Sequence, residues 1–105
     1  MELRRYARAP LNVSVEFSQK GKTERVLGLS RDISLGGMFI ETHAPLDHNA
    51  ELTVFLVLPS QPAPFALPGV VRWTRPDGMG IQFGLVGARE TFAITEVTRE
   101  QAPQT

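Results

Sequence analysis

Apolar and polar side chains alternate in two segments of the chain, which is the pattern of β-strands with one buried face. In residues 11–17, apolar side chains occupy every second position and polar ones lie between them, and residues 51–58 repeat this pattern. Successive side chains of a strand point to opposite faces, so each segment predicts a strand with one face on a core. The expected inward residues are Leu11, Val13, Val15, Phe17, Leu52, Val54, Leu56 and Leu58.

Two further predicted strands flank a pair of glycines. A glycine-containing turn at residues 19–23 follows the first strand. Residues 25–33 predict a second strand and residues 38–42 a third, with Gly36 and Gly37 between them. In the second strand, the alternation predicts Leu27, Leu29 and Ile33 on the inner face and Gly28, Ser30 and Asp32 on the outer face.

The carboxyl-terminal half predicts two more strands and one ambiguous element. Residues 65–74 have the composition of a strand, which the Pro-Gly step at 68–69 should bend or delay. Pro-Asp-Gly at 76–78 is a strong hairpin-turn sequence, and residues 79–83 predict the returning strand. Residues 88–97 fit a terminal helix, but their Thr, Phe, Ile and Val content also suits a strand.

Six short strands joined by turn residues predict a mainly β domain. Proline-containing loops at residues 44–50 and 59–64 separate neighbouring strands. This spacing fits a small antiparallel barrel or a sandwich. The chain divides into a flexible basic arm at residues 1–10, a barrel-like domain at residues 11–100 and a disordered tail at residues 101–105.

Composition removes several classes of function. The 105 residues include 11 basic and 11 acidic ones, so net charge gives no bulk attraction to nucleic acid or membranes. No cysteine is present, which excludes disulfides, thiolate metal sites and cysteine nucleophiles. No apolar run approaches the roughly 18 residues of a membrane helix, and the amino terminus lacks a signal-peptide stretch. We therefore expect a cytoplasmic protein without membrane insertion.

Positive charge is nevertheless concentrated in the basic arm. Arg4, Arg5 and Arg8 are opposed only by Glu2 within the first ten residues. An arginine presents a planar fork that binds the O6 and N7 atoms of guanine, and the same fork binds phosphate. The basic arm is therefore a candidate for nucleotide binding.

A second candidate segment ends the second predicted strand. Asp32 and Ser34 are two residues apart, so a strand would project both side chains outward, opposite the predicted core face. Gly36 and Gly37 would let a flat ligand approach the backbone closely. The Asp32 carboxylate can accept hydrogen bonds from the donor groups of guanine. Together with the arginines, this segment suits a ligand that contains guanines and phosphates.

Each candidate also has an ordinary structural interpretation. A basic amino terminus is often solvated decoration, and a D-x-S-x-x-G string is usually a turn with a side-chain–backbone hydrogen bond. Trp73 fits a core or rim position better than base stacking. His43, Asp47 and His48 lack a recognised ligand spacing, so no metal site is expected. Ser34 lies in no nucleophile motif, so no enzyme activity is expected.

The two segments together resemble the signature of the PilZ domain family, which has R-x-x-x-R before its first strand and D/N-x-S-x-x-G after its second. The residues that match these motifs are Arg4, Arg8, Asp32, Ser34 and Gly37. Residues 78–83 are also similar to the family's glycine-flanked last strand, and the resemblance covers residues 4–97. It implies a six-stranded antiparallel β-barrel with a carboxyl-terminal helix, and cyclic di-GMP as ligand without another cofactor.

By this resemblance the chain is a bacterial cyclic di-GMP receptor that catalyses nothing. The ligand would order the basic arm over the barrel face and thereby signal to an unidentified effector protein. The expected ligand-binding residues are Arg4, Arg5, Arg8, Asp32, Ser34, Gly36 and Gly37. Two alternatives stay open: a PilZ-like interaction module without a ligand and, less favoured by the neutral net charge, a barrel for single-stranded nucleic acid.

Overall fold

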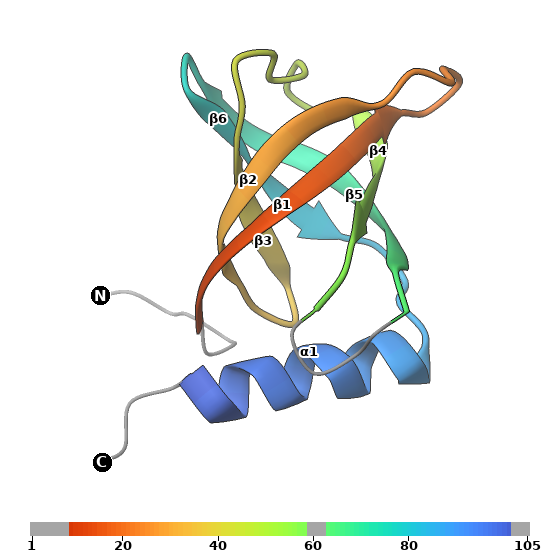
Figure 1. Ribbon diagram of the computed structural model, residues 1–105. Helices are drawn as coiled ribbons and strands as arrows, with labels where there is room; N and C mark the ends of the chain where they lie inside the picture. Colours follow the sequence, from red (N-terminus) through yellow and green to blue (C-terminus); the bar gives the residue numbers. More distant parts are fainter. Residues whose placement is uncertain (1–8, 59–62, 102–105) are drawn as a thin grey trace.

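Six β-strands and one α-helix form most of the molecule. The computed structural model describes residues 9–58 and 63–101. In chain order, the elements are β1 (Ala9–Gln19), β2 (Val26–Ile33), β3 (Gly37–Glu41), β4 (Glu51–Leu56), β5 (Phe65–Arg75), β6 (Gly78–Phe83) and α1 (Ala88–Gln101), as Figure 1 shows.

The strands close into a barrel in the order β1-β2-β3-β6-β5-β4, with β4 pairing back onto β1. Every neighbouring pair is antiparallel. In Figure 1, α1 lies across one end of the barrel. The six-stranded antiparallel barrel expected from the resemblance is confirmed, and the sandwich alternative is excluded.

The alternating segments of β1 and β4 line the barrel interior as predicted. Phe17 and Val54 are completely buried, whereas the polar residues between the apolar ones face outward. Removing these side chains from water is the main stabilising contribution, about 25 cal/mol for each Å² of apolar surface. The buried core comprises Leu11, Val15, Phe17, Ile33, Met38, Ile40, Leu52, Val54, Leu56, Leu58, Phe65, Leu67, Val71, Met79, Ile81, Phe83, Ala93, Ile94 and Val97.

The ambiguous terminal segment is a helix. In α1, the consecutive residues Ala93 and Ile94 are both buried, as is Val97 one turn further on. A strand would have pointed Ala93 and Ile94 to opposite faces, whereas a helix carries both on the face that packs against the barrel. Burial of this face therefore decides the structure of a segment whose local composition suits either element.

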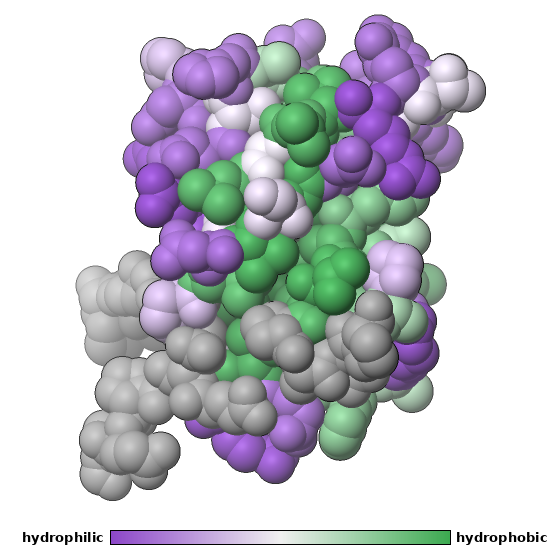
Figure 2. Space-filling view, viewed as in Figure 1, coloured by the Kyte–Doolittle hydropathy of each residue, from purple (hydrophilic) through white to green (hydrophobic). Residues whose placement is uncertain are grey.

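The inner face predicted for β2 is wrong. Leu27 is exposed over 70% of its surface and Leu29 is only half-buried, whereas Ser30 is completely buried. Ile33 is buried as expected. The exposed Leu27 lines a groove together with Phe55 and Val57. Figure 2 shows an apolar band on the face where β1 and β2 lie in front.

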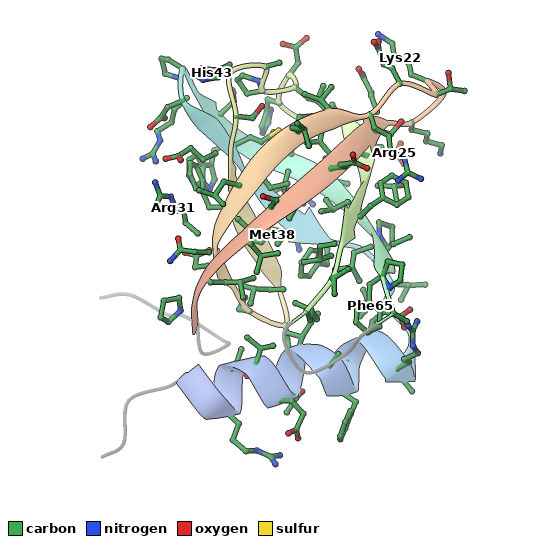
Figure 3. The ribbon with its side chains drawn as sticks, in the orientation of Figure 1. Lys22, Arg25, Arg31, Met38, His43 and Phe65 are labelled. Carbon is green, nitrogen blue, oxygen red and sulfur yellow. The ribbon has the colours of Figure 1, made fainter. Side chains whose placement is uncertain are left out.

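A β-bulge at Arg31 explains this error. The pairing of β2 with β3 skips Arg31 between Ser30 and Asp32, so the two inward residues, Ser30 and Ile33, are three positions apart instead of two or four. Arg31 points away from the barrel (Figure 3). The Ser30 hydroxyl donates a hydrogen bond to the Asp32 carbonyl oxygen at 3.1 Å, which satisfies a polar group in the interior.

The boundaries of the barrel extend beyond those predicted. β1 begins at Ala9, so Ala9 and Pro10 belong to the barrel and not to the basic arm. α1 ends at Gln101, the first residue assigned to the disordered tail. The rest of the arm and of the tail, residues 1–8 and 102–105, lies outside the described part of the chain.

β5 passes through the Pro-Gly step at 68–69 without interruption and is joined to β6 by the predicted hairpin turn, at residues 76–77. Its irregularity lies further on. Val71 and Trp73 pair with consecutive residues of β6, so Arg72 is the extra residue of a second bulge. In β2 and in β5, one bulge therefore changes which of the alternating side chains face the core.

Candidate ligand-binding site

Asp32 lies on the outer face of the barrel, directly after the bulge of β2. It is half-buried, and its Oδ1 atom accepts a hydrogen bond from the backbone nitrogen of Phe39 at 3.2 Å. Its partner on β1 is Pro10, the second residue of that strand. The beginning of β1 is therefore beside Asp32.

Ser34 forms a tight turn between β2 and β3. Its backbone nitrogen donates to the Gly37 carbonyl oxygen at 2.9 Å, and its hydroxyl oxygen accepts from the Gly36 nitrogen at 3.2 Å. The side chain is only 4% exposed. The expectation of an outward Ser34 hydroxyl is therefore wrong, because this hydroxyl is used inside the turn. The interpretation of the D-x-S-x-x-G string as a hydrogen-bonded turn is confirmed.

The two glycines of the turn pack against β6. A Cβ atom on Gly37 would overlap the carbonyl oxygen of Ile81, so only glycine allows β3 and β6 to approach this closely. The Gly36 carbonyl oxygen accepts a hydrogen bond from the Phe83 nitrogen at 2.9 Å. Packing of the barrel is thus sufficient to require Gly37, and a contact of either glycine with a ligand stays a prediction.

A row of paired residues leads from Asp32 across the outer face to β5. From β2 to β5, the row consists of Asp32, Phe39, Gly80 and Trp73, each paired with the next on the neighbouring strand. Trp73 is 44% exposed. The bulge at Arg72 turns it outward, because uninterrupted alternation of β5 would have placed Trp73 in the core. Both ends of the row are therefore set by bulges.

The side chains of Phe39 and Trp73, here called the aromatic platform, lie across β6. A Cβ atom on Gly78 would collide with the Phe39 ring, and one on Gly80 would collide with the Trp73 indole. The two rings are stacked, with centroids 5.4 Å apart and an interplanar angle of 16°. The glycines of β6 therefore provide the space that the platform occupies.

Arg75 extends over the aromatic platform. Its guanidinium carbon lies 4.9 Å from the centroid of the Phe39 ring and 5.1 Å from that of Trp73, within the range of cation–π interactions. Its Nε atom lies 3.3 Å from Oδ1 of Asp77. These contacts favour one position for the planar, positively charged group of Arg75.

The structure tests only part of the predicted site. Arg4, Arg5 and Arg8 lie outside the described residues, so their contribution stays a prediction. The sequence-based site omitted Phe39 and Arg75. The alternate glycines of the last strand were the available signal, because a glycine on the outer face of a strand leaves room for a large side chain from its neighbour.

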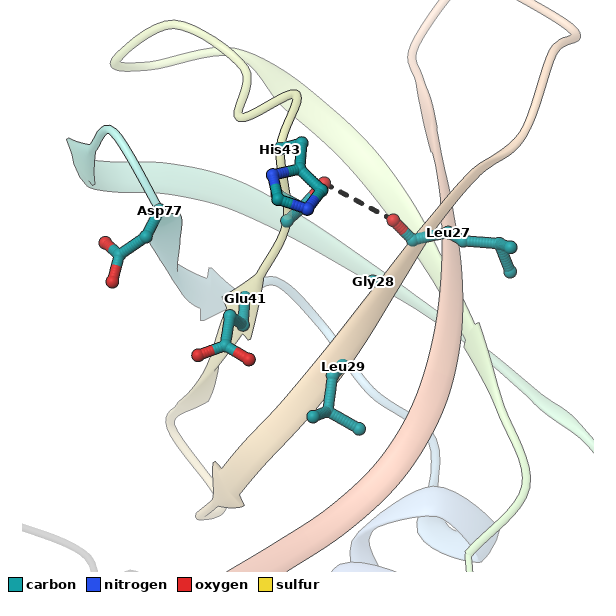
Figure 4. Close-up of a pocket in the computed structure, with 7 residues that line it drawn as sticks. Leu27, Gly28, Leu29, Glu41, His43 and Asp77 are labelled. Atoms are coloured by element: carbon teal, nitrogen blue, oxygen red, sulfur yellow. Dashed lines mark hydrogen bonds between the residues drawn. The ribbon is translucent and has the colours of Figure 1, made fainter.

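A pocket of about 340 Å³ opens between β2 and β3 at the Glu41 end of β3 (Figure 4). Its lining includes Glu41, His43 and Asp77, and the Thr42 hydroxyl donates to the Leu27 carbonyl oxygen at 3.3 Å. Both carboxylates are paired with arginines, Glu41 with Arg31 at 3.1 Å and Asp77 with Arg75 at 3.3 Å.

The described residues, 9–58 and 63–101, contain no cluster of three or more His, Cys, Asp or Glu side chains that could hold a metal ion. The only helix among these residues, α1, is not long and apolar enough to cross a membrane.

Comparison with solved structures identifies several similar barrels. The PilZ domain of CeSA from a cellulose-synthesizing bacterium is 18% identical, with a TM-score of 0.70 over 89% of this chain and 95% of that one. The PilZ domain of YcgR from Escherichia coli, solved with c-di-GMP, is 12% identical, with a TM-score of 0.75 over 95% and 92%. Bacillus subtilis MotI is 20% identical, with a TM-score of 0.76 over 96% of this chain and 52% of its own.

The chain thus spans about half the length of MotI and nearly all of the two isolated PilZ domains. No curated protein sequence matches it. Among models of protein families, the PilZ domain matches residues 2–95, which is most of the chain. The chain therefore belongs to the PilZ domain family.

Proposed function

We propose that this domain is a receptor for cyclic di-GMP that binds the nucleotide beside Asp32 and does not catalyse a reaction. One observation carries the proposal: Pro10 of β1 pairs with Asp32 of β2. Consecutive Cα atoms are about 3.8 Å apart. Arg8, two residues before Pro10, is therefore close enough in the chain to act with Asp32 on one ligand.

The residue types suit the two parts of this nucleotide. The forks of Arg4, Arg5 and Arg8 can bind phosphates or the O6 and N7 atoms of a guanine. The Asp32 carboxylate can accept hydrogen bonds from guanine donors. In this proposal Ser34, with Gly36 and Gly37, maintains the shape of the turn against which the ligand lies. YcgR and MrkH, two proteins of similar fold, have been solved as c-di-GMP complexes, which supports this choice of ligand.

The proposal includes an output through a partner protein. Ordering of the basic arm over the bound ligand would change the surface that the partner meets. A separate groove of about 330 Å³, whose lining includes Leu27, Phe55 and Val57, gives the barrel an exposed apolar face. This groove supports protein binding and favours, as a second candidate, an interaction module without a ligand. A cytoplasmic location is part of the proposal, since a second messenger would reach the site there.

Titration calorimetry with cyclic di-GMP, GMP, cyclic di-AMP and short single-stranded DNA tests the proposal. We expect saturable binding of cyclic di-GMP and far weaker binding of the other three. Adenine carries a donor amine where guanine carries the O6 acceptor, and an arginine cannot accept a hydrogen bond. Equal affinity for cyclic di-AMP, or no heat with cyclic di-GMP, would refute the proposal.

Variants then locate the site. Arg8→Ala should remove most of the affinity without changing the melting temperature, and Asp32→Ala should weaken binding by about 1–3 kcal/mol. Lys20→Ala is the matched control, because its surface ion pair with Glu51 lies at the far end of β1. Amide exchange across residues 4–9 should slow at saturation if the basic arm becomes ordered. Unchanged binding in both site variants would mean that the ligand binds elsewhere.

A further inference from the structure

The geometry points to Arg75 as a further ligand-binding residue, one that holds the second guanine of cyclic di-GMP beside the site at Asp32. This inference rests on the proposed function and extends it to a residue outside both sequence motifs. The role assigned to Arg75 is donation of two hydrogen bonds to the N7 and O6 acceptors on one edge of the base.

The Arg75 side chain is held in position by its neighbours while part of its guanidinium group stays accessible to solvent. The two rings of the aromatic platform lie at 4.9 and 5.1 Å from its guanidinium carbon, and the ion pair with Asp77 engages its Nε atom. Across residues 9–58 and 63–101, no side chain or carbonyl group accepts a hydrogen bond from the two terminal nitrogens. The side chain is 54% exposed. Its fork therefore stays available while its position is restrained.

The aromatic platform also connects Arg75 to the proposed site. Phe39 contacts both groups: its backbone nitrogen donates to Asp32, and its ring lies under the Arg75 guanidinium. Neighbouring strands are about 4.8 Å apart, so the row from Asp32 to Trp73 spans roughly 14 Å. One nucleotide with two bases can then use the motif residues for one guanine and Arg75 for the other.

The platform favours a base over a phosphate as the group bound by Arg75. An exposed guanidinium alone would suit a phosphate equally well. Trp73, however, is 44% exposed beside it, and an indole face stacks on flat bases. Guanine uses both features, because its edge carries two adjacent acceptors and its face can stack.

Arg25 provides a matched control. Its guanidinium carbon lies 3.7 Å from the centroid of the Phe55 ring, and its Nη1 atom pairs with Glu16 at 3.1 Å, so Arg25 too is held by an aromatic ring and a carboxylate. Figure 3 shows Arg25 on the opposite side of the barrel from Arg31, the neighbour of Asp32. Loss of Arg25 therefore removes the same kind of contact away from the site.

Calorimetry with cyclic di-GMP would compare the wild-type chain with Arg75→Ala, Arg75→Lys and Arg25→Ala. Both Arg75 variants should bind about tenfold or more weakly, because neither alanine nor an ammonium group forms the two-point contact. Arg25→Ala should bind like wild type. Trp73 is the sole tryptophan of the chain, so a change in intrinsic fluorescence on ligand binding should report stacking beside Arg75.

The outcomes separate this inference from the proposed function. If Arg75→Ala bound cyclic di-GMP as tightly as the wild-type chain does, the inference would be wrong and the proposed function would stay intact. Absence of binding to the wild-type chain would overturn both. If inorganic phosphate alone reproduced the fluorescence change and competed with cyclic di-GMP, Arg75 would bind a phosphate and the assignment to guanine would be wrong.

Discussion

The two halves of β5 have different roles in the molecule. From Phe65 to Val71 every second side chain is buried, and Leu67 is completely inaccessible. Beyond the bulge at Arg72, every residue up to Arg75 is exposed. The first half packs the core, whereas the second half carries Trp73 and Arg75 on the outer face, beside Phe39 of β3.

β2 repeats this division. Its bulge at Arg31 separates the buried Ser30 from Asp32 on the outer face, as the bulge of β5 separates the buried Val71 from Trp73. Asp32 and Trp73 are the two ends of one cross-strand row. This barrel thus builds its core where side chains alternate regularly, and its candidate site where a bulge shifts that alternation, at Arg31 in β2 and at Arg72 in β5.

The largest difference between the two halves of β5 should be one of stability. Leu67→Ala removes a completely buried side chain and should lower the free energy of unfolding by about 2–5 kcal/mol. Trp73→Ala should cost about 1 kcal/mol, because Trp73 is nearly half exposed. Urea denaturation of both variants measures the difference. Equal losses would show that the outer face contributes as much to stability as the core.

Regular alternation is the part of the fold that the sequence predicts well. The inward faces of β1 and β4 and the turn between β5 and β6 follow from patterns a few residues long. The bulges do not, because one extra residue moves every later side chain to the other face without changing the composition of the strand. For this reason Leu27 and Leu29 were expected in the core, whereas Leu27 is exposed and Leu29 is half-buried.

The candidate site was predictable only where it coincides with a motif. Asp32 belongs to a motif in the sequence, and its position on the outer face was expected correctly, although it is half-buried there; the buried hydroxyl of Ser34 was not expected. Phe39 and Arg75 are 36 positions apart and meet only because β3 and β5 both pair with β6. Such a contact depends on strand order, which local periodicity does not contain.

A smaller effect should follow from filling the space beneath the aromatic platform. Gly80→Ala would place a Cβ atom against the Trp73 indole, so the ring must move, and we expect a loss of about 1–3 kcal/mol in the free energy of unfolding. The tryptophan emission should shift as well. Gly84→Ala is the control, because its Cβ atom would meet only Pro68, at 3.7 Å or more. Similar losses in both variants would mean that the platform does not depend on Gly80.

The smallest effect is expected at the bulge residue of β2 itself. The Arg31 side chain lies 3.1 Å from Glu41 and 3.4 Å from Asn12 at the surface, and ion pairs of this kind contribute about 0–1 kcal/mol. The bulge is also held by the backbone register and by the hydrogen bond between Asp32 and the Phe39 nitrogen, neither of which requires the Arg31 side chain.

Arg31→Ala should therefore lower the free energy of unfolding by less than about 1 kcal/mol and change the affinity for cyclic di-GMP by less than about threefold. Denaturation and calorimetry on the same variant measure the two quantities separately. A tenfold loss of affinity at unchanged stability would show that Arg31 contacts the ligand. A large loss of stability would show instead that the Arg31 side chain stabilises the bulge. The outward position of Asp32, which the bulge produces, would then depend on a surface ion pair.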